Sequence, residues 1–195
     1  FDNNGIRQWG TYYGGTSDEW GGGCAFDASG NIFISGETAS SNGNSIATPG
    51  SHQPVFGVGS TDGFLAKFNF TGTRLWGTYY GGSGRDAAYT CTVDLSGNCY
   101  LVGSTSSPSG ISSLGAYQPV YGGASSWWGD AFIAKFDANG LRQWSTYYGG
   151  TGDDWAYNCV LDASGNIYIA GTTSALSQTV ISTSGSHQPA FGGGA

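Results

Sequence analysis

The chain has 195 residues, of which 38% are hydrophobic, 15% aromatic and only 10% charged, with 36 glycines and a net charge of −7. This profile is typical of an all-β protein with many tight turns, and it excludes a disordered chain, which carries more charge and fewer aromatic residues. Lys and Arg number only six, so the positive clusters needed to bind nucleic acid or an anionic membrane are missing, and no stretch approaches the roughly 20 apolar residues of a membrane-spanning helix.

One 15-residue motif occurs three times along the chain. It reads FDNNGIRQWGTYYGG at residues 1–15, FNFTGTRLWGTYYGG at 68–82 and FDANGLRQWSTYYGG at 136–150. The offsets of 67 and 68 residues define a tandem array with repeats at 1–67, 68–135 and 136–195, the last one truncated. Residues present in every copy are expected to serve the architecture, and function is expected where the copies differ.

Each repeat contains runs of residues typical of β-strands, joined in pairs by tight turns. The first kind of hairpin turns through DASGN or DLSGN and spans Cys24–Ser35, Cys91–Val102 and Tyr157–Ala170. The second kind joins Asp62–Phe68 to Thr73–Tyr80, and Asp130–Phe136 to Leu141–Tyr148. No segment shows a 3.6-residue apolar period with caps, so helix is expected to be nearly absent. Four antiparallel strands per repeat predict one blade of a β-propeller; a β-solenoid is the alternative, although its coils are usually shorter.

The predicted fold is therefore an all-β propeller region over residues 1–195, built from four-stranded antiparallel blades. About three blades are expected, at 17–82, 83–150 and 151–195, with residues 1–16, including a strand at Ile6–Tyr13, belonging to an adjacent blade. The third blade stops at GGGA, where a run like DAFIAK is expected. Propellers close with about four to eight blades, and open sheet edges are a liability. We therefore expect a piece of a longer propeller or a protomer that assembles with another.

The repeated motifs resemble a known family. G-x-R-x-W-x-T-Y-Y-G-G, D-x-S-G-N-x-Y-x-x-G, Q-P-V-Y/F-G and D-A-F-I-A-K-F are similar to the SBBP-type bacterial β-propeller repeat, over essentially the whole chain. This resemblance implies a secreted or cell-surface bacterial protein with many repeats. It implies little about activity.

The candidate site lies in the unequal loops between hairpins, because long loops on a rigid scaffold commonly carry binding function. Aromatic rings beside carboxylates suit the apolar faces and hydroxyl groups of sugars. The alternative is that these aromatic residues fill gaps between blades, as Trp9, Trp76, Trp144 and the Tyr-Tyr pairs are expected to do. The candidate ligand-binding residues are Asp18, Trp20, Trp127, Trp128, Asp153 and Trp155.

Other reactive side chains receive structural interpretations. Asp153 and Asp154 are weak calcium candidates, but Asp154, like Glu19 and Asp86 at the same repeat position, is expected to cap a turn by accepting backbone hydrogen bonds. The SHQP motifs containing His52 and His187 become AYQP in the second copy, which favours a packing or anchoring role. Buried free thiols are expected at the cysteines, with a register-dependent Cys91–Cys99 bridge as the alternative.

The sequence thus predicts a non-catalytic extracellular or cell-surface module, a structural or adhesive scaffold that presents loops to a protein or glycan. A lectin-like, carbohydrate-binding propeller is the alternative, and an enzyme whose site lies on further blades is a third hypothesis, because no convergent set of acids or histidines is apparent here. The expected partners are other propeller blades, from the same polypeptide or a second protomer, and a glycan or surface protein. No nucleic acid, membrane insertion or cofactor is expected, calcium being the one weak exception.

Overall fold

The computed structural model describes residues 1–123, 128–174 and 181–192. Within these ranges no helix has the length and apolar character needed to cross a membrane. A short 3-10 turn, η1 (Gly43–Ser45), lies in the loop after the second strand. The strands are β1 (Glu19–Phe26), β2 (Ile32–Thr38), β3 (Asp62–Phe68), β4 (Arg74–Tyr80), β5 (Asp86–Val93), β6 (Cys99–Thr105), β7 (Asp130–Phe136), β8 (Arg142–Tyr148), β9 (Asp154–Leu161) and β10 (Ile167–Thr173).

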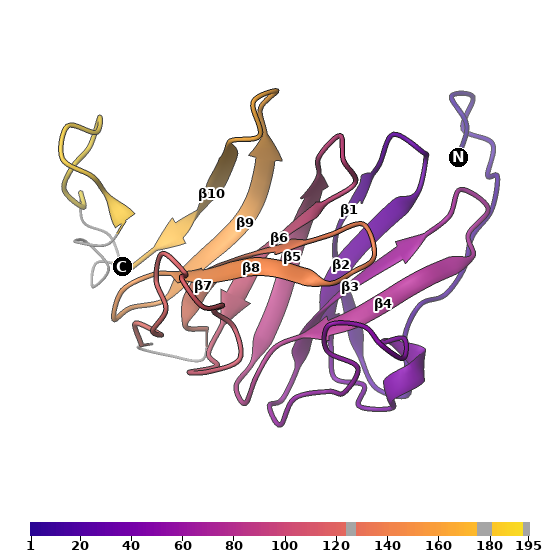
Figure 1. Cartoon of the computed structure of the whole chain (residues 1–195), viewed down its shortest axis with the longest axis horizontal. Helices are drawn as coiled ribbons and strands as arrows, with labels where there is room; N and C mark the ends of the chain where they lie inside the picture. Colours follow the sequence, from indigo (N-terminus) through magenta and orange to yellow (C-terminus); the bar gives the residue numbers. More distant parts are fainter. Residues whose placement is uncertain (124–127, 175–180, 193–195) are drawn as a thin grey trace.

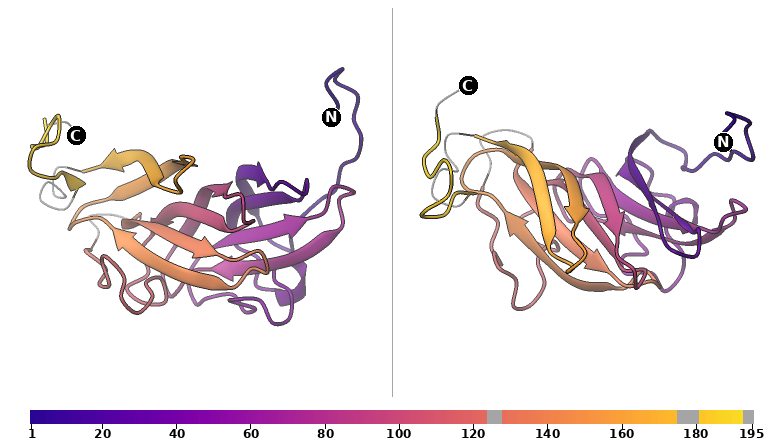
Figure 2. Two further views of the ribbon diagram at one scale, coloured as in Figure 1. Left: turned by 45° about the horizontal axis from the view of Figure 1, so that its top comes forward. Right: turned by 90° about the horizontal axis from the view of Figure 1, so that it is seen from above.

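The strands form three antiparallel sheets in sequence order. The first is β1-β2-β3-β4, the second is β5-β6-β7-β8, and β9 pairs with β10 alone. The sheets lie side by side in a row with the two chain termini at opposite ends (Figures 1 and 2). The first strands β1, β5 and β9 are neighbours. The all-β prediction is confirmed: two four-stranded blades and a two-stranded sheet make up part of a propeller, and the described strands do not close into a ring.

The turn signature of the first hairpins works through one aspartate. Asp27 Oδ1 accepts the backbone N–H groups of Ser29 at 3.0 Å and Asn31 at 2.9 Å, and Asp94 and Asp162 make the same bonds in the other two copies. The glycine of each turn has a positive φ, 75° at Gly30, which a residue without Cβ adopts at little cost. These local bonds explain why DxSGN produces a tight hairpin in all three copies.

The main hydrophobic core lies between the first two blades. Phe33, Leu65 and Trp76 from the first blade pack with Leu101 and Phe132 from the second in one buried cluster. Neighbouring sheets bury these large apolar side chains against each other, so packing between blades contributes to the stability of the chain.

The repeated Tyr-Tyr pair holds each blade together and joins it to the next. The first tyrosine donates to a loop carbonyl of its own blade, from Tyr79 to Ser40 at 2.8 Å. The second donates to the following blade, from Tyr80 to Ile111 at 2.8 Å. The later and earlier copies repeat these bonds at Tyr147 to Ser107, Tyr148 to Ile181 and Tyr13 to Ile46.

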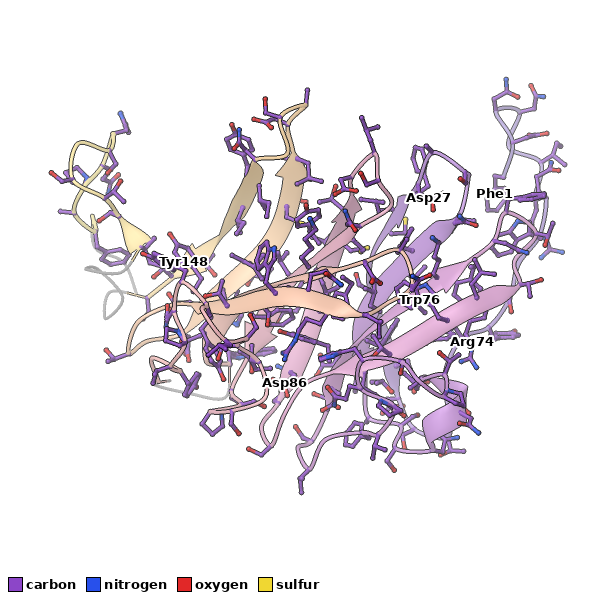
Figure 3. The ribbon with its side chains drawn as sticks, viewed as in Figure 1. Phe1, Asp27, Arg74, Trp76, Asp86 and Tyr148 are labelled. Carbon is purple, nitrogen blue, oxygen red and sulfur yellow. The ribbon has the colours of Figure 1, made fainter. Side chains whose placement is uncertain are left out.

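The repeated tryptophan makes a second contact between blades. Trp76 Nε1 donates to the carbonyl of Ala138 at 3.0 Å, in the turn between β7 and β8, and Trp9 donates to Phe70 at 2.9 Å in the equivalent turn. The predicted packing role is therefore confirmed for Trp76 (Figure 3) and for Tyr79, Tyr80 and Tyr147, which are all buried, whereas the side chains of Trp9 and Trp144 are partly exposed.

The N-terminal segment keeps the contacts of a last blade strand without forming one. Trp9 and Tyr13 bond to the first blade as their counterparts bond to the second, but no β-ladder among the described residues includes 6–13. The side chain of Tyr12, the counterpart of buried Tyr79, is fully exposed. A strand needs a neighbour to pair with, and none of the described residues pairs with 6–13 as β3 pairs with β4. Membership of residues 1–16 in an adjacent blade stays a prediction.

All four cysteines are free thiols. Cys91, Cys99 and Cys159 are buried as expected, but Cys24 is exposed, so the expectation of burial was wrong there. Cys99 pairs with Val93 rather than with Cys91 in the β5–β6 ladder.

Candidate functional site

A row of aromatic rings crosses the junction between the second and third sheets. Trp128, which precedes β7, meets Trp155 of β9 edge to face, with ring centroids 5.9 Å apart. Trp155 stacks on Tyr157 at 6.3 Å with an interplanar angle of 18°, and Tyr157 meets Tyr89 of β5 at 5.4 Å. We call these four residues the aromatic strip.

The two tyrosines of the aromatic strip, Tyr89 and Tyr157, lie at β-bulges. The β5–β6 register shifts between Ala88 and Thr90, which leaves Tyr89 as the extra residue of a β-bulge. The β9–β10 register shifts in the same place, so Tyr157 is the extra residue of the third sheet. A bulge turns its side chain away from the regular alternation, and both tyrosines therefore point to the same junction. In the first sheet the bulge falls at Gly22 and Gly23, which carry no ring.

A cation covers one end of the strip. The Arg85 guanidinium lies 3.7 Å from the centroid of the Trp128 ring and forms an ion pair with Glu37 at 2.8 Å. Glu37 also accepts the hydroxyl of Thr61 at 2.6 Å. These contacts join three segments distant in sequence, and they hold Trp128 between the blades through cation–π attraction and packing. Within the strip Tyr157 is the more open ring, because it is 50% exposed.

The predicted six-residue site divides into two groups. Trp128, Trp155 and Asp153 come together, since Asp153 Oδ1 accepts the N–H of Gly129, the residue after Trp128, at 3.4 Å. Trp20 lies in β1 of the first sheet and Asp18 directly precedes that strand, and Trp20 takes part in none of the ring contacts among the described residues. Trp127 lies outside the described residues.

The exposure of Trp20 follows from its place in the repeat. It occupies the position of Trp155, whose ring partner Trp128 comes from the preceding blade. No preceding blade covers Trp20 among the described residues, and its side chain is 51% exposed. The interpretation that these tryptophans fill gaps between blades therefore fits Trp128 and Trp155 directly.

The carboxylates at the start of β1, β5 and β9 hold loops. Asp86 Oδ2 accepts the N–H of Gly82 at 2.8 Å, and Asp154 Oδ2 accepts that of Gly150 at 2.9 Å, as the capping interpretation expects. Glu19 accepts the hydroxyl of Thr38 at 2.9 Å, as Asp86 accepts that of the equivalent Thr105. No group of three or more His, Cys, Asp or Glu side chains that could hold a metal ion occurs among the described residues. Calcium at Asp153 and Asp154 stays a prediction.

Sequence analysis missed a second set of carboxyl groups, at the start of β3 and β7. Asp62 Oδ2 accepts Gln53 Nε2 and the N–H of Gly57, both at 2.8 Å, while its buried Oδ1 has no hydrogen-bond partner. Asp130 makes the equivalent bonds to Gln118 and Gly122. Burial, with the neighbouring carboxylate of Asp86, raises the pKa of Asp62 to about 7. The signal was present in the repeated Gln-Pro motifs, whose glutamines are the partners of these aspartates.

The histidine of the same loop is a packing residue, as expected. The His52 ring lies 5.8 Å from the Phe136 ring and 6.2 Å from Tyr80, and Tyr117 in the next copy meets Tyr148 at 6.5 Å. Burial and the nearby Arg142 lower the pKa of His52 to about 4, so the imidazole is neutral at pH 7.

Antiparallel four-stranded sheets that repeat in a row, joined by the same bonds at each junction, define a protein of the β-propeller class. Residues 143–176 match the family model described as "SBBP: Beta-propeller repeat". The match runs from the last strand of the second blade through the β9–β10 hairpin, so the chain carries a repeat of this type at that junction. No curated protein shows significant similarity to the chain.

Proposed function

We propose that this chain is a non-catalytic propeller module of an extracellular or cell-surface protein, which serves as a structural or adhesive scaffold and presents its unequal loops to a partner. The observation that carries the proposal is that repeated residues and residues that differ between copies make different kinds of contact. Those present in every copy, such as Tyr80, Trp76 and Gln53, bond one loop or blade to the next. Those that differ between copies gather in the aromatic strip.

The burial of the carboxyl groups supports a non-catalytic role for them. Asp62, Asp86 and Asp130 have no exposed surface, and their oxygens accept hydrogen bonds from loop residues. A general acid or base has to reach a substrate atom within hydrogen-bond distance. Side chains enclosed in this way act on the loops that surround them.

The surface location is supported by the resemblance of the motifs to SBBP-type repeats. It is tested on intact cells that make the full-length protein, with an antibody raised against residues 17–150. Added protease should abolish the antibody signal from intact cells while a cytoplasmic marker protein persists. A signal that protease removes only after lysis contradicts an extracellular location.

The second candidate function is binding of a carbohydrate at the aromatic strip. One observation favours it: Tyr157 is half exposed and stacks on Trp155, so part of an aromatic surface is open to solvent, and Asp153 precedes Trp155 by two residues. Such surfaces bind the apolar faces of sugar rings. The test is a glycan array followed by calorimetric titration of any sugar that binds.

The variants Trp155→Ala and Tyr157→Ala should abolish binding of that sugar, and Tyr117→Ala, which removes an exposed ring elsewhere, is the matched control. If the array is empty, or if the strip variants bind like the wild type, the carbohydrate function is refuted. The scaffold function does not depend on that result.

A further inference from the structure

The two-stranded third sheet has an edge that is paired in the other two. In the first blade, β2 pairs with β3 from Ile32↔Phe68 to Thr38↔Asp62, and in the second β6 pairs with β7 from Cys99↔Phe136 to Thr105↔Asp130. β10 is the counterpart of β2 and β6, yet among the described residues it pairs only with β9. Its other edge lies at the end of the row (Figure 1), with backbone groups available to another strand.

A cavity beside that edge corresponds to a space that an aromatic ring fills in the other two blades. It measures about 220 Å³ and is lined by Tyr148, Ala156, Ile169, Gly171 and Ile181 among others. In the second blade the equivalent space holds the Phe132 ring, which lies against Gly103 and 4.9 Å from the Tyr80 ring. In the first blade Phe64 lies against Gly36 and 5.3 Å from Tyr13. In both four-stranded blades, a phenylalanine at the third position of the third strand therefore fills this space.

Trp144 differs from its counterparts in the other copies. Its counterparts Trp76 and Trp9 donate their indole N–H to a turn carbonyl of the following blade and lie against the turn glycines Gly140 and Gly72. Trp144 forms no such bond within the described residues, and its side chain is 36% exposed.

Gln188 occupies the position of the two glutamines that bind the first residue of β3 and of β7. Gln53 and Gln118 each donate to an aspartate that is the first residue of the next strand, and Gly57 and Gly122 donate to the same oxygen. Gln188 and Gly192 repeat this spacing, and Gln188 Nε2 already donates to Ala190, as Gln118 does to Val120. The loop after β10 thus holds the two donors in the order that receives a carboxylate in the other copies.

We propose that β10, the Gly171 cavity, Trp144 and Gln188 together form an acceptor site for a β-hairpin donated by a further repeat of the same type. The donated hairpin has a first strand of the pattern Asp-x-Phe-x-Ala-Lys-Phe and a turn with glycine in its last position. Its strand pairs with β10, its phenylalanine fills the cavity, its aspartate accepts from Gln188 and a carbonyl of its turn accepts from Trp144. A second copy of this chain is a poor donor, because its hairpins of this pattern are paired within its own blades.

The probe is a synthetic peptide that copies residues 129–150, with its own Trp144→Phe so that tryptophan emission reports only on the chain. At saturation the peptide should shift the emission to shorter wavelength and protect the amide hydrogens of Ile167–Thr173 from exchange. A peptide with Phe132→Ala should bind at least about 100-fold more weakly, because the cavity stays empty. A peptide with Leu141→Ala is the matched control, since Leu141 is 47% exposed in its own blade, and it should bind like the parent.

A fusion protein that carries the hairpin in the same polypeptide tests the proposal without a soluble peptide. Residues 129–150 are appended after Ala195 through a Gly-Ser linker; the fusion should melt at a higher temperature than the chain, and Phe132→Ala in the appended copy should remove more of that gain than Leu141→Ala. Equal effects of the two substitutions, unprotected β10 amides, or a chain that dimerises by itself with those amides protected would each overturn the proposal.

Discussion

The buried carboxyl group of Asp62 predicts that the protein loses stability as the pH rises. Its pKa is raised from 3.8 to about 7, chiefly by burial. Between these values the folded protein keeps a proton that the unfolded chain has released, so the free energy of unfolding decreases with increasing pH. The proton belongs on Oδ1, because Oδ2 accepts bonds from Gln53 and Gly57 while Oδ1 has no partner.

The size of the effect follows from the shift. Each pKa unit corresponds to 1.36 kcal/mol, so a rise of about three units makes Asp62 responsible for up to about 4 kcal/mol of lost stability between pH 4 and pH 8. Asn keeps an oxygen that accepts from Gln53 and Gly57 but cannot ionise. Asp62→Asn should therefore be close to the wild type at pH 4.5 and more stable than it at pH 8.

Urea unfolding followed by tryptophan fluorescence at intervals from pH 4.5 to 8.5 measures this difference. Burial also raises the pKa of Asp130 to about 7, so the wild type and Asp62→Asn both retain that dependence and only their difference isolates Asp62. Asp18→Asn removes the same charge from an exposed residue and should run parallel to the wild type. If Asp62→Asn also runs parallel, the carboxyl group is ionised in the folded protein and the reasoning is refuted.

Three further substitutions test the joints between and within blades, each by urea unfolding. Gly22→Val should cost about 3 kcal/mol, because a Cβ there would lie 2.5 Å from Ala88 O, whereas Gly21→Val, with no atom within 4 Å, should cost less than about 1 kcal/mol. Tyr80→Phe should cost about 1 kcal/mol, since Ile111 O keeps the donors Arg142 and Ser145. Asp27→Ala should cost about 3 kcal/mol, because Lys67, paired at 3.1 Å, would be left buried and unpaired. Equal losses for both glycine variants, a loss above 3 kcal/mol for Tyr80→Phe, or none for Asp27→Ala would contradict the packing described.

Most of the fold could be predicted because its signals are local and repeated. The Asp-x-x-Gly turns need only bonds between residues two to four positions apart, such as Asp27 with Ser29 and Asn31, and the strand alternation is readable within each run. The predicted strands at Asp62–Phe68 and Asp130–Phe136 coincide with β3 and β7. The strand expected at Ile6–Tyr13 is not formed, because a ladder depends on a neighbour as well as on local propensity.

The candidate site was harder to predict because it depends on how blades pack. Trp128 and Trp155 meet across a junction, and the Arg85 contact that holds Trp128 also requires Glu37 from the first blade. Tyr89 and Tyr157 enter the strip through β-bulges, which have no sequence signature here. The residue at the bulge nevertheless differs between the copies, because Gly22 stands where the other two have Tyr89 and Tyr157. A comparison of the three copies would therefore have singled out this position.

Each residue of the YYGG motif in the second copy is committed to contacts within or between blades. Tyr79 bonds within its blade and Tyr80 to the next one. A Cβ atom at Gly81 would lie 2.6 Å from Oδ1 of Asp62 and from Oδ2 of Asp86, so no larger residue fits between the two carboxyl groups. The N–H of Gly81 donates to Gln53, and that of the following glycine donates to Asp86. Every residue of this copy, from Tyr79 to Gly82, thus has its side chain, its N–H or its lack of a Cβ committed to the joint. A ligand that contacted these groups would have to break the joint, so the proposed binding function requires positions outside the motif, such as the half-exposed Tyr157.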